Sequence, residues 1–102
     1  MTNNELESAL LKNEITVIYF WSPNCSKCKL YGPGIESFSQ NKGLTLIKVD
    51  TSKEMDVGLK YGVLSLPTVI FFRRGLEKIR ITSANISMAE IEKSFVKITQ
   101  NS

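Results

Sequence analysis

The stretch ITVIYFWSPNCSKC, residues 15–28, joins an apolar run to the only two cysteines of the chain. The run from Ile15 to Trp21 is rich in β-branched and aromatic residues, which is typical of a strand buried on both faces. Cys25 and Cys28 follow where this strand is expected to pass into a helix, and residues three apart on a helix share one face. Their spacing is close to what a disulfide tolerates. The stretch therefore predicts a strand, a turn and a helix that begins with a redox-capable thiol pair.

The position of the first cysteine favours reactivity. A helix N-terminus presents unpaired backbone N–H groups and the positive end of the helix dipole, and both favour a thiolate. Because the thiolate is the reactive form, we expect Cys25 to be the nucleophile that attacks a disulfide of a partner protein. Cys28, one turn deeper and less exposed, would then act as the resolving cysteine: it would attack the sulfur of Cys25 and release the reduced partner.

Other roles for the two thiols stay open at this point. Zinc takes four ligands, and the chain has no histidine and no third cysteine, so only a dimer could complete such a site. A structural disulfide and unrelated thiols are the remaining alternatives. Lys27 between the cysteines also has two interpretations. It could favour the Cys25 thiolate as a nearby cation, or it could point into water, where screening leaves little effect.

Composition narrows the function classes. The chain has 102 residues, 42% of them hydrophobic, and a formal net charge of +3, which predicts a single domain over residues 1–102 with one core. The basic residues are spread along the chain and mixed with acids, so a nucleic-acid partner is not expected. The polar N-terminus lacks a signal-peptide pattern and no apolar run could span a bilayer, so we expect a cytoplasmic protein without a membrane partner. No exposed apolar helix face is evident in the sequence, so we expect a monomer.

Hydrophobic periodicity predicts the order helix–strand–helix–strand–helix–strand–strand–helix. The expected helices cover residues 5–13, 25–40, 51–62 and 87 onward, and the expected strands cover residues 15–21, 44–50, 68–72 and 77–81. Capping boxes are expected at Thr2, Thr51 and Ser87, and a kink at Pro33. Helices between successive apolar strands imply parallel crossovers, and the short link Arg73–Gly75 implies an antiparallel hairpin. The result is an α/β fold with one mixed sheet covered on both faces.

Several segments resemble the thioredoxin family. Residues 20–29, FWSPNCSKCK, are similar to the family's active-site segment, in which Phe-Trp leads into Trp-Cys-Gly-Pro-Cys-Lys. Residues 61–68, YGVLSLPT, resemble the family's Tyr-Gly-Val-x-Ser-x-Pro-Thr, and Pro33 falls where the family's second helix has its proline. The resemblance covers most of the chain. It implies a thioredoxin fold, a three-layer α/β/α sandwich with a cis-proline loop, and a thiol–disulfide oxidoreductase with no cofactor beyond the redox-active Cys25–Cys28 pair and no metal.

The resemblance also implies how substrates bind. Base rates favour a trans bond before Pro67, whereas the family implies a cis Leu66–Pro67 bond that faces the cysteines and leaves the Leu66 backbone free to pair with a substrate strand. The residues expected to position substrate are Trp21, Asn24, Ser26, Lys27, Leu66 and Pro67. The implied partners are disulfide-containing client proteins and a reductase or other dithiol electron donor. A binding or adaptor module with little turnover is the alternative function.

Four departures from the family limit this resemblance. Tyr19 stands where the family has a buried aspartate, and Leu46 stands in the place of its lysine partner. Without that acid, Cys28 must lose its proton to water, to a phenol or to the substrate, so slower resolution of the mixed disulfide is expected. Asn24 replaces an exposed tryptophan, and Ser83 replaces a frequent glycine. The family's first strand is missing or reduced to residues 1–3. These differences predict a divergent member with a narrower client set.

Overall fold

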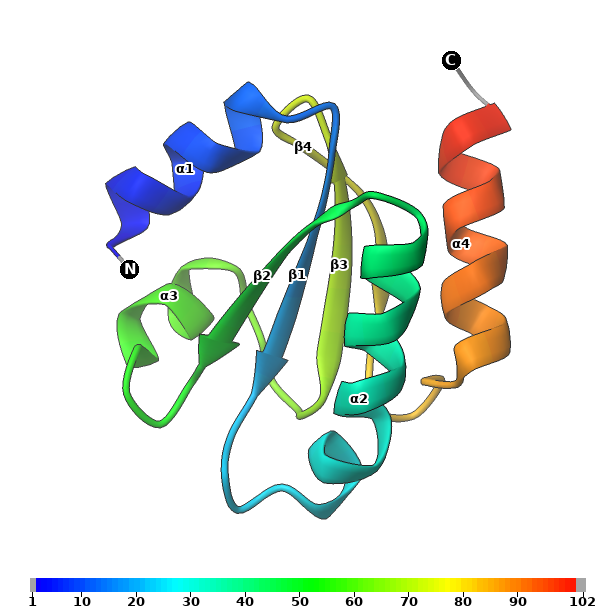
Figure 1. Cartoon of the computed structure of the whole chain (residues 1–102). Coiled ribbons are helices and arrows are strands. Elements are labelled where there is room, and N and C mark those ends of the chain that lie inside the picture. The colour runs from blue at the N-terminus through cyan, green and yellow to red at the C-terminus, as the bar shows by residue number, and fades with distance from the viewer. Residues whose placement is uncertain (1, 101–102) are drawn as a thin grey trace.

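The computed structural model describes residues 2–100, and its elements follow the predicted order (Figure 1). The helices are α1 (Asn3–Lys12), α2 (Ser26–Asn41), α3 (Met55–Lys60) and α4 (Met88–Gln100), and the strands are β1 (Ile15–Trp21), β2 (Thr45–Asp50), β3 (Thr68–Arg73) and β4 (Leu76–Ile81). The strands form one sheet in the order β2-β1-β3-β4. Helices α1 and α3 cover one face of the sheet, and α2 and α4 cover the other (Figure 1). The predicted three-layer architecture is confirmed.

Strand β1 is buried on both faces, as its sequence predicts. Successive side chains of a strand point to opposite faces, so β1 contributes to two cores. Val17 and Tyr19 pack on the side of α2 and α4, whereas Ile18 and Phe20 pack on the side of α1 and α3. The helices complete these cores with buried aliphatic and aromatic side chains, namely Ile35, Phe38, Ile91 and Ile98 on the first side and Leu6, Leu10 and Val57 on the second.

The connection from β2 to β3 differs from the predicted parallel crossover. Strand β1 pairs with β2 in parallel but with β3 in antiparallel orientation. Helix α3 has only six residues and is about 9 Å long, whereas a six-residue strand spans about 20 Å. It therefore cannot return the chain to the edge of the sheet where β2 began. Helix α2, with 16 residues, can do so. Consequently β3 starts at the edge where β1 and β2 end.

The link between β3 and β4 is the predicted antiparallel hairpin. Arg74 and Gly75 form its turn with positive φ angles of 51° and 86°, as a two-residue hairpin turn of type I′ requires. A β-bulge shifts the register of the β3–β4 pairing between Phe71 and Phe72. Strand β4 therefore closes one side of the sheet as an irregular edge.

Two of the predicted capping bonds form and one predicted box does not. Thr2 and Glu5 form the complete box at α1, and the Ser87 hydroxyl accepts a hydrogen bond from a backbone N–H in the first turn of α4. The hydroxyl of Thr51 instead donates to the carbonyl of Trp21 at 3.2 Å. The N–H of Glu54, which the box would have satisfied, donates to the carbonyl of Asp50 at 2.8 Å. Helix α3 begins later than predicted, at Met55, and no side chain caps its first turn.

Arg80 is half-buried although the alternation of β4 predicts that it faces water. Its guanidinium donates to the carbonyls of Tyr61 and Gly62 at 2.6 and 3.2 Å. It also donates to both carboxylate oxygens of Glu77, each at 2.9 Å. This hydrogen bonding raises the pKa of Arg80 and ties the edge strand to the loop that leads to Pro67.

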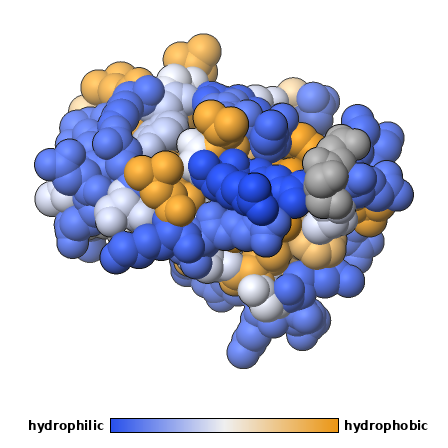
Figure 2. Space-filling view, turned by 90° about the horizontal axis from the view of Figure 1, so that it is seen from above, coloured by the Kyte–Doolittle hydropathy of each residue, from blue (hydrophilic) through white to orange (hydrophobic). Residues whose placement is uncertain are grey.

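The end of the molecule that is uppermost in Figure 1 is largely polar. Figure 2 looks onto the upper end of the molecule in Figure 1, where hydrophilic side chains predominate and apolar ones are scattered. Within residues 2–100, no helix has both the length and the apolar composition that crossing a bilayer requires.

We expect Arg80→Met to lower the free energy of unfolding by about 2 kcal/mol, because two backbone carbonyls lose a charged donor. Arg74→Met is the matched control. Arg74 is 75% exposed and lies 3.7 Å from Glu14 in an ion pair, so its replacement should cost less than about 0.5 kcal/mol. Urea unfolding of both variants measures the difference, and equal losses would contradict the role given to Arg80.

Candidate active site

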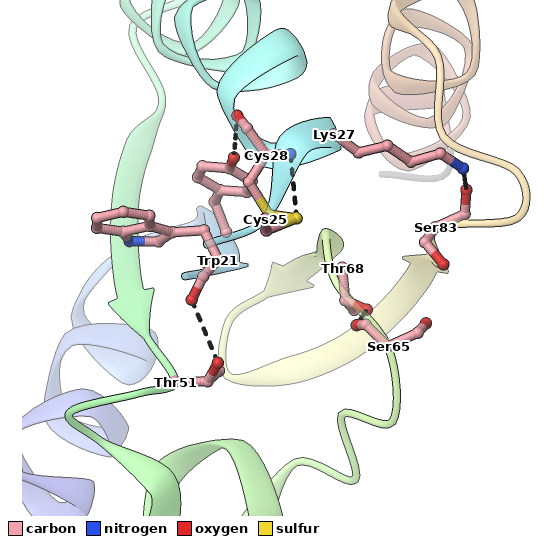
Figure 3. The surroundings of a disulfide bond; sticks show 9 residues. Trp21, Cys25, Lys27, Cys28, Thr51, Ser65, Thr68 and Ser83 are labelled. Carbon is pink, nitrogen blue, oxygen red and sulfur yellow. Dashed lines mark hydrogen bonds between the residues drawn. A yellow bond between two sulfur atoms is a disulfide. The ribbon is translucent and has the colours of Figure 1, made fainter. Parts of the chain in front are cut away.

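Cys25 and Cys28 are joined by a disulfide at the start of α2 (Figure 3). Their Cα atoms lie 5.2 Å apart. Cys25 is the N-cap of α2, and its Sγ accepts a hydrogen bond from the N–H of Cys28 at 3.2 Å. Cys25 is half-buried, whereas Cys28 is only 3% exposed. The sulfur of Cys25 is thus more accessible and sits at a helix N-terminus, which favours a negative charge there once the bond is reduced.

The loop before β3 lies at the same edge of the sheet. The Leu66–Pro67 bond is cis, the isomer that the resemblance implies. Pro67 is buried and Leu66 is half-buried. The hydroxyl of Thr68 donates to the carbonyl of Ser65 at 2.7 Å and closes the loop across the proline. Figure 3 shows Ser65 and Thr68 on this loop near the disulfide.

Trp21 lies beside the disulfide rather than deep in the core. It is half-buried at the end of β1, and its carbonyl accepts hydrogen bonds from the N–H and the hydroxyl of Thr51 at 2.9 and 3.2 Å (Figure 3). The ammonium group of Lys48 lies 5.4 Å from the centre of its ring, a cation–π contact. These contacts hold the indole on the β2 side of Cys28.

In the disulfide form Lys27 is exposed, which is closer to the interpretation that it points into water than to that of a cation beside the sulfur. Its side chain extends away from the disulfide, and its Nζ donates to the carbonyl of Ser83 at 3.0 Å (Figure 3). Ser83 lies in the loop between β4 and α4, where carbonyls lack the ladder partners of a strand. Lys27 therefore connects the first turn of α2 to that loop. The neighbouring candidates Asn24 and Ser26 are exposed.

Tyr19 contacts the backbone of the buried cysteine. It is 2% exposed, and its hydroxyl donates to the carbonyl of Cys28 at 2.8 Å. Gly32 leaves room for the phenol, because a Cβ there would lie 3.3 Å from the hydroxyl oxygen. Burial, and to a smaller extent the charge of Glu36, raise the pKa of Tyr19 to about 12. The phenol is therefore neutral near pH 7 and is not a base for the Cys28 proton.

A hollow opens beside Cys28 between α2 and the sheet. Its lining includes Tyr19, Cys28, Glu36 and Lys48. Glu36 on α2 forms an ion pair with Lys48 on β2. Sequence reasoning missed both residues, although a signal for Glu36 was available: Cys28, Gly32 and Glu36 recur every four residues on one face of a helix. Lys48 is the register partner of Tyr19, a pairing that the sequence alone does not give.

A second groove, lined mostly by apolar side chains, borders the loop before Pro67. Its lining includes Met55 and Leu59 of α3 and Leu64, which are 65%, 77% and 98% exposed. The expectation of a monomer rested on the lack of an exposed apolar helix face. The exposed side chains of α3 show that this premise is wrong, so the oligomeric state stays a prediction without that support.

Comparison with known proteins agrees with the fold and the thiol pair. Residues 1–97 match the family model described as thioredoxin. Thioredoxin-1 of Saccharomyces cerevisiae is 33% identical over 85 residues, which cover 82% of this chain and 82% of that protein. The thioredoxin of Mycoplasmoides gallisepticum is 38% identical over 72 residues, covering 70% and 72%. The mitochondrial thioredoxin-2 of Schizosaccharomyces pombe is 37% identical over 75 residues, which are 72% of this chain but 56% of that protein.

Solved structures show the same architecture. The thioredoxin of Fasciola hepatica superposes with a TM-score of 0.84 at 23% identity, covering 92% of this chain and 91% of the other. The reduced thioredoxin of Schistosoma mansoni superposes with a TM-score of 0.83 at 28% identity, covering 92% and 90%. The predicted thioredoxin fold is confirmed.

We expect the stabilising effect of the Tyr19 hydroxyl to shrink in alkali. At about pH 8, Tyr19→Phe should lower the free energy of unfolding by about 1 kcal/mol, because a buried hydrogen bond is lost. An unfolded tyrosine loses its proton near pH 10, whereas folded Tyr19 keeps its proton up to about pH 12. The unfolded chain therefore binds fewer protons at Tyr19 in this window, so the wild type loses the stability that Tyr19 contributes, and the variant has no such contribution to lose. Urea unfolding of both proteins at about pH 8 and about pH 11 measures the difference, and a constant difference would contradict it.

Proposed function

Because the chain belongs to the thioredoxin family and is a thiol–disulfide oxidoreductase of that family, we propose that it reduces or exchanges disulfides in partner proteins through Cys25 and Cys28. The observation that carries this proposal is the pair itself. One sulfur caps the first turn of α2 and is accessible, and the other is buried one turn deeper and already bonded to it.

The proposed reaction has two exchange steps. The Cys25 thiolate attacks one sulfur of a client disulfide, and the other client sulfur leaves with the electron pair as a thiolate. Cys28 then attacks the sulfur of Cys25. This step forms the Cys25–Cys28 bond, breaks the bond to the client and releases the second client sulfur. The client disulfide is reduced and the protein dithiol is oxidised. A reductase or another dithiol donor would return the protein to its reduced form.

The surroundings of the disulfide support a role in holding a client strand. The half-buried Leu66 precedes Pro67 at the edge that carries the disulfide, so its backbone is placed to pair with an extended segment. Trp21 would form one wall of this site. The exposed polar residues Asn24 and Ser26 offer little apolar contact to a client, which supports a narrow client set.

Three further expectations belong to the same proposal. Residues 1–102 would act as one thioredoxin-like domain. Lys27, held by the carbonyl of Ser83, would shape the wall of the substrate site rather than touch the reacting sulfur. A cytoplasmic location stays a prediction, and one of the relatives described above is named as mitochondrial.

A disulfide-reduction assay tests the proposal. With dithiothreitol as electron source, the wild type should accelerate the reduction of insulin, and Cys25→Ser should abolish the acceleration because the nucleophile is lost. Cys28→Ser should accumulate a stable mixed disulfide with client proteins, because the second exchange step cannot occur. Mass spectrometry of the trapped complexes identifies the clients.

The two variants also separate the alternatives. A wild type that binds partners but reduces no disulfide would favour an adaptor module over an enzyme. A Cys28→Ser protein that forms no mixed disulfide would contradict Cys25 as the attacking thiol.

A further inference from the structure

The second exchange step raises the question of where the proton of Cys28 goes. Cys28 is 3% exposed, and burial in apolar surroundings favours the thiol over the thiolate. Its sulfur can form the new bond only as its proton leaves. A group able to accept a proton must therefore communicate with this buried position.

Tyr19, whose hydroxyl bonds to the backbone of Cys28, is not the proton acceptor. The Tyr19 hydroxyl donates to the Cys28 carbonyl and stays protonated near neutrality. It orients the backbone of Cys28, but it is not free to take a proton from the sulfur.

The hollow beside Cys28 contains a different acceptor. Its titratable and charged side chains are Tyr19 from β1, Lys48 from β2, and Cys28, Lys29 and Glu36 from α2. The two lysines carry protons already, so the carboxylate of Glu36 is the one anionic base in this lining. The hollow has a volume of about 280 Å³, and a water molecule takes about 30 Å³ in the liquid. It therefore has room for several waters between the sulfur and the carboxylate.

The structure also shows what holds Glu36 in place. The ammonium group of Lys48 pairs with its carboxylate and at the same time lies over the ring of Trp21. These two contacts keep the lysine, and with it the carboxylate, at the mouth of the hollow. Glu36 also faces Tyr19 across the hollow, and its charge adds to the effect of burial in raising the pKa of Tyr19.

We propose that Glu36 accepts the proton of Cys28 through water in this hollow, and that Lys48 positions Glu36 for this task. The inference rests on the proposed function and adds the proton route of its second step. The Cys28 sulfur bonds to the Cys25 sulfur, and the client sulfur leaves as a thiolate with the electron pair of the broken bond. The Cys28 proton moves to the Glu36 carboxylate and from there to solvent, and the client thiolate takes a proton from solvent.

Stopped-flow reaction of the reduced protein with one equivalent of dithiobis-nitrobenzoate separates the two steps. Attack by Cys25 releases one coloured nitrothiobenzoate ion, and attack by Cys28 on the mixed disulfide releases a second. Glu36→Gln should slow the second release about tenfold near pH 7, less than a typical general-base effect because a carboxylate is a weak base for a thiol. The first release should stay within about twofold.

The pH profile distinguishes proton transfer from a structural effect. In the wild type, the rate of the second release should change little between about pH 6 and about pH 7.5. The base is then the carboxylate, whose supply does not fall with pH in this range as the supply of hydroxide does. In Glu36→Gln it should rise about tenfold per pH unit, because only the rare thiolate form of Cys28 reacts. Lys48→Met should slow the second release about threefold and keep the wild-type pH profile, because the carboxylate remains but is less well placed.

Two further variants complete the test. Glu92→Gln changes an exposed carboxylate on α4 and should leave both releases unchanged. Tyr19→Phe removes the phenol and should keep the second release within about threefold of the wild type. A larger loss in Tyr19→Phe than in Glu36→Gln, or an unchanged rate and pH profile in Glu36→Gln, would overturn the inference. A wild type without any second release would overturn the proposed function itself.

Discussion

The pairing of β1 with β3 is the constraint on which the site depends. Strand β1 is the one strand of the described sheet that joins its parallel and antiparallel parts, and burial on both faces makes its register costly to shift. Because α3 is too short to carry the chain back across the sheet, β3 must begin where β1 ends. Thr68 is thereby aligned with Phe20, and the disulfide and the proline loop meet without any direct bond between them.

The core beside the disulfide is packed around the aromatic ring of Tyr19. A phenol at position 19 fills the space next to α2 with an apolar ring and one hydroxyl, and Gly32 supplies the room for it. A neutral hydroxyl that is fully hydrogen-bonded costs less to bury than a carboxylate. The acidic group in the hollow beside the buried thiol then lies at the surface, on Glu36, where Lys48 stabilises it. Tyr19 thus fills the core, while Glu36 supplies the negative charge near the buried sulfur.

Local patterns predicted most of the fold, and long-range contacts account for what they missed. The apolar run of β1, the hairpin turn at Gly75 and the helix start at Cys25 each depend on neighbours in the chain, so they were readable from the sequence. The hydroxyl of Thr51 bonds to a carbonyl 30 residues away and does not cap α3 as predicted. Lys27 likewise bonds 56 residues away. Such partners are set by the register of the sheet, which periodicity alone does not give.

The irregular outer strand has a consequence for how the molecule behaves among its copies. A free strand edge offers unpaired backbone groups that can recruit another chain and start aggregation. Here β4 carries a bulge and the exposed Lys78, while on the opposite edge β2 projects Lys48. The bulge and charge on one flank and the charge on the other oppose the addition of another strand, so the sheet is protected against growing into a fibre.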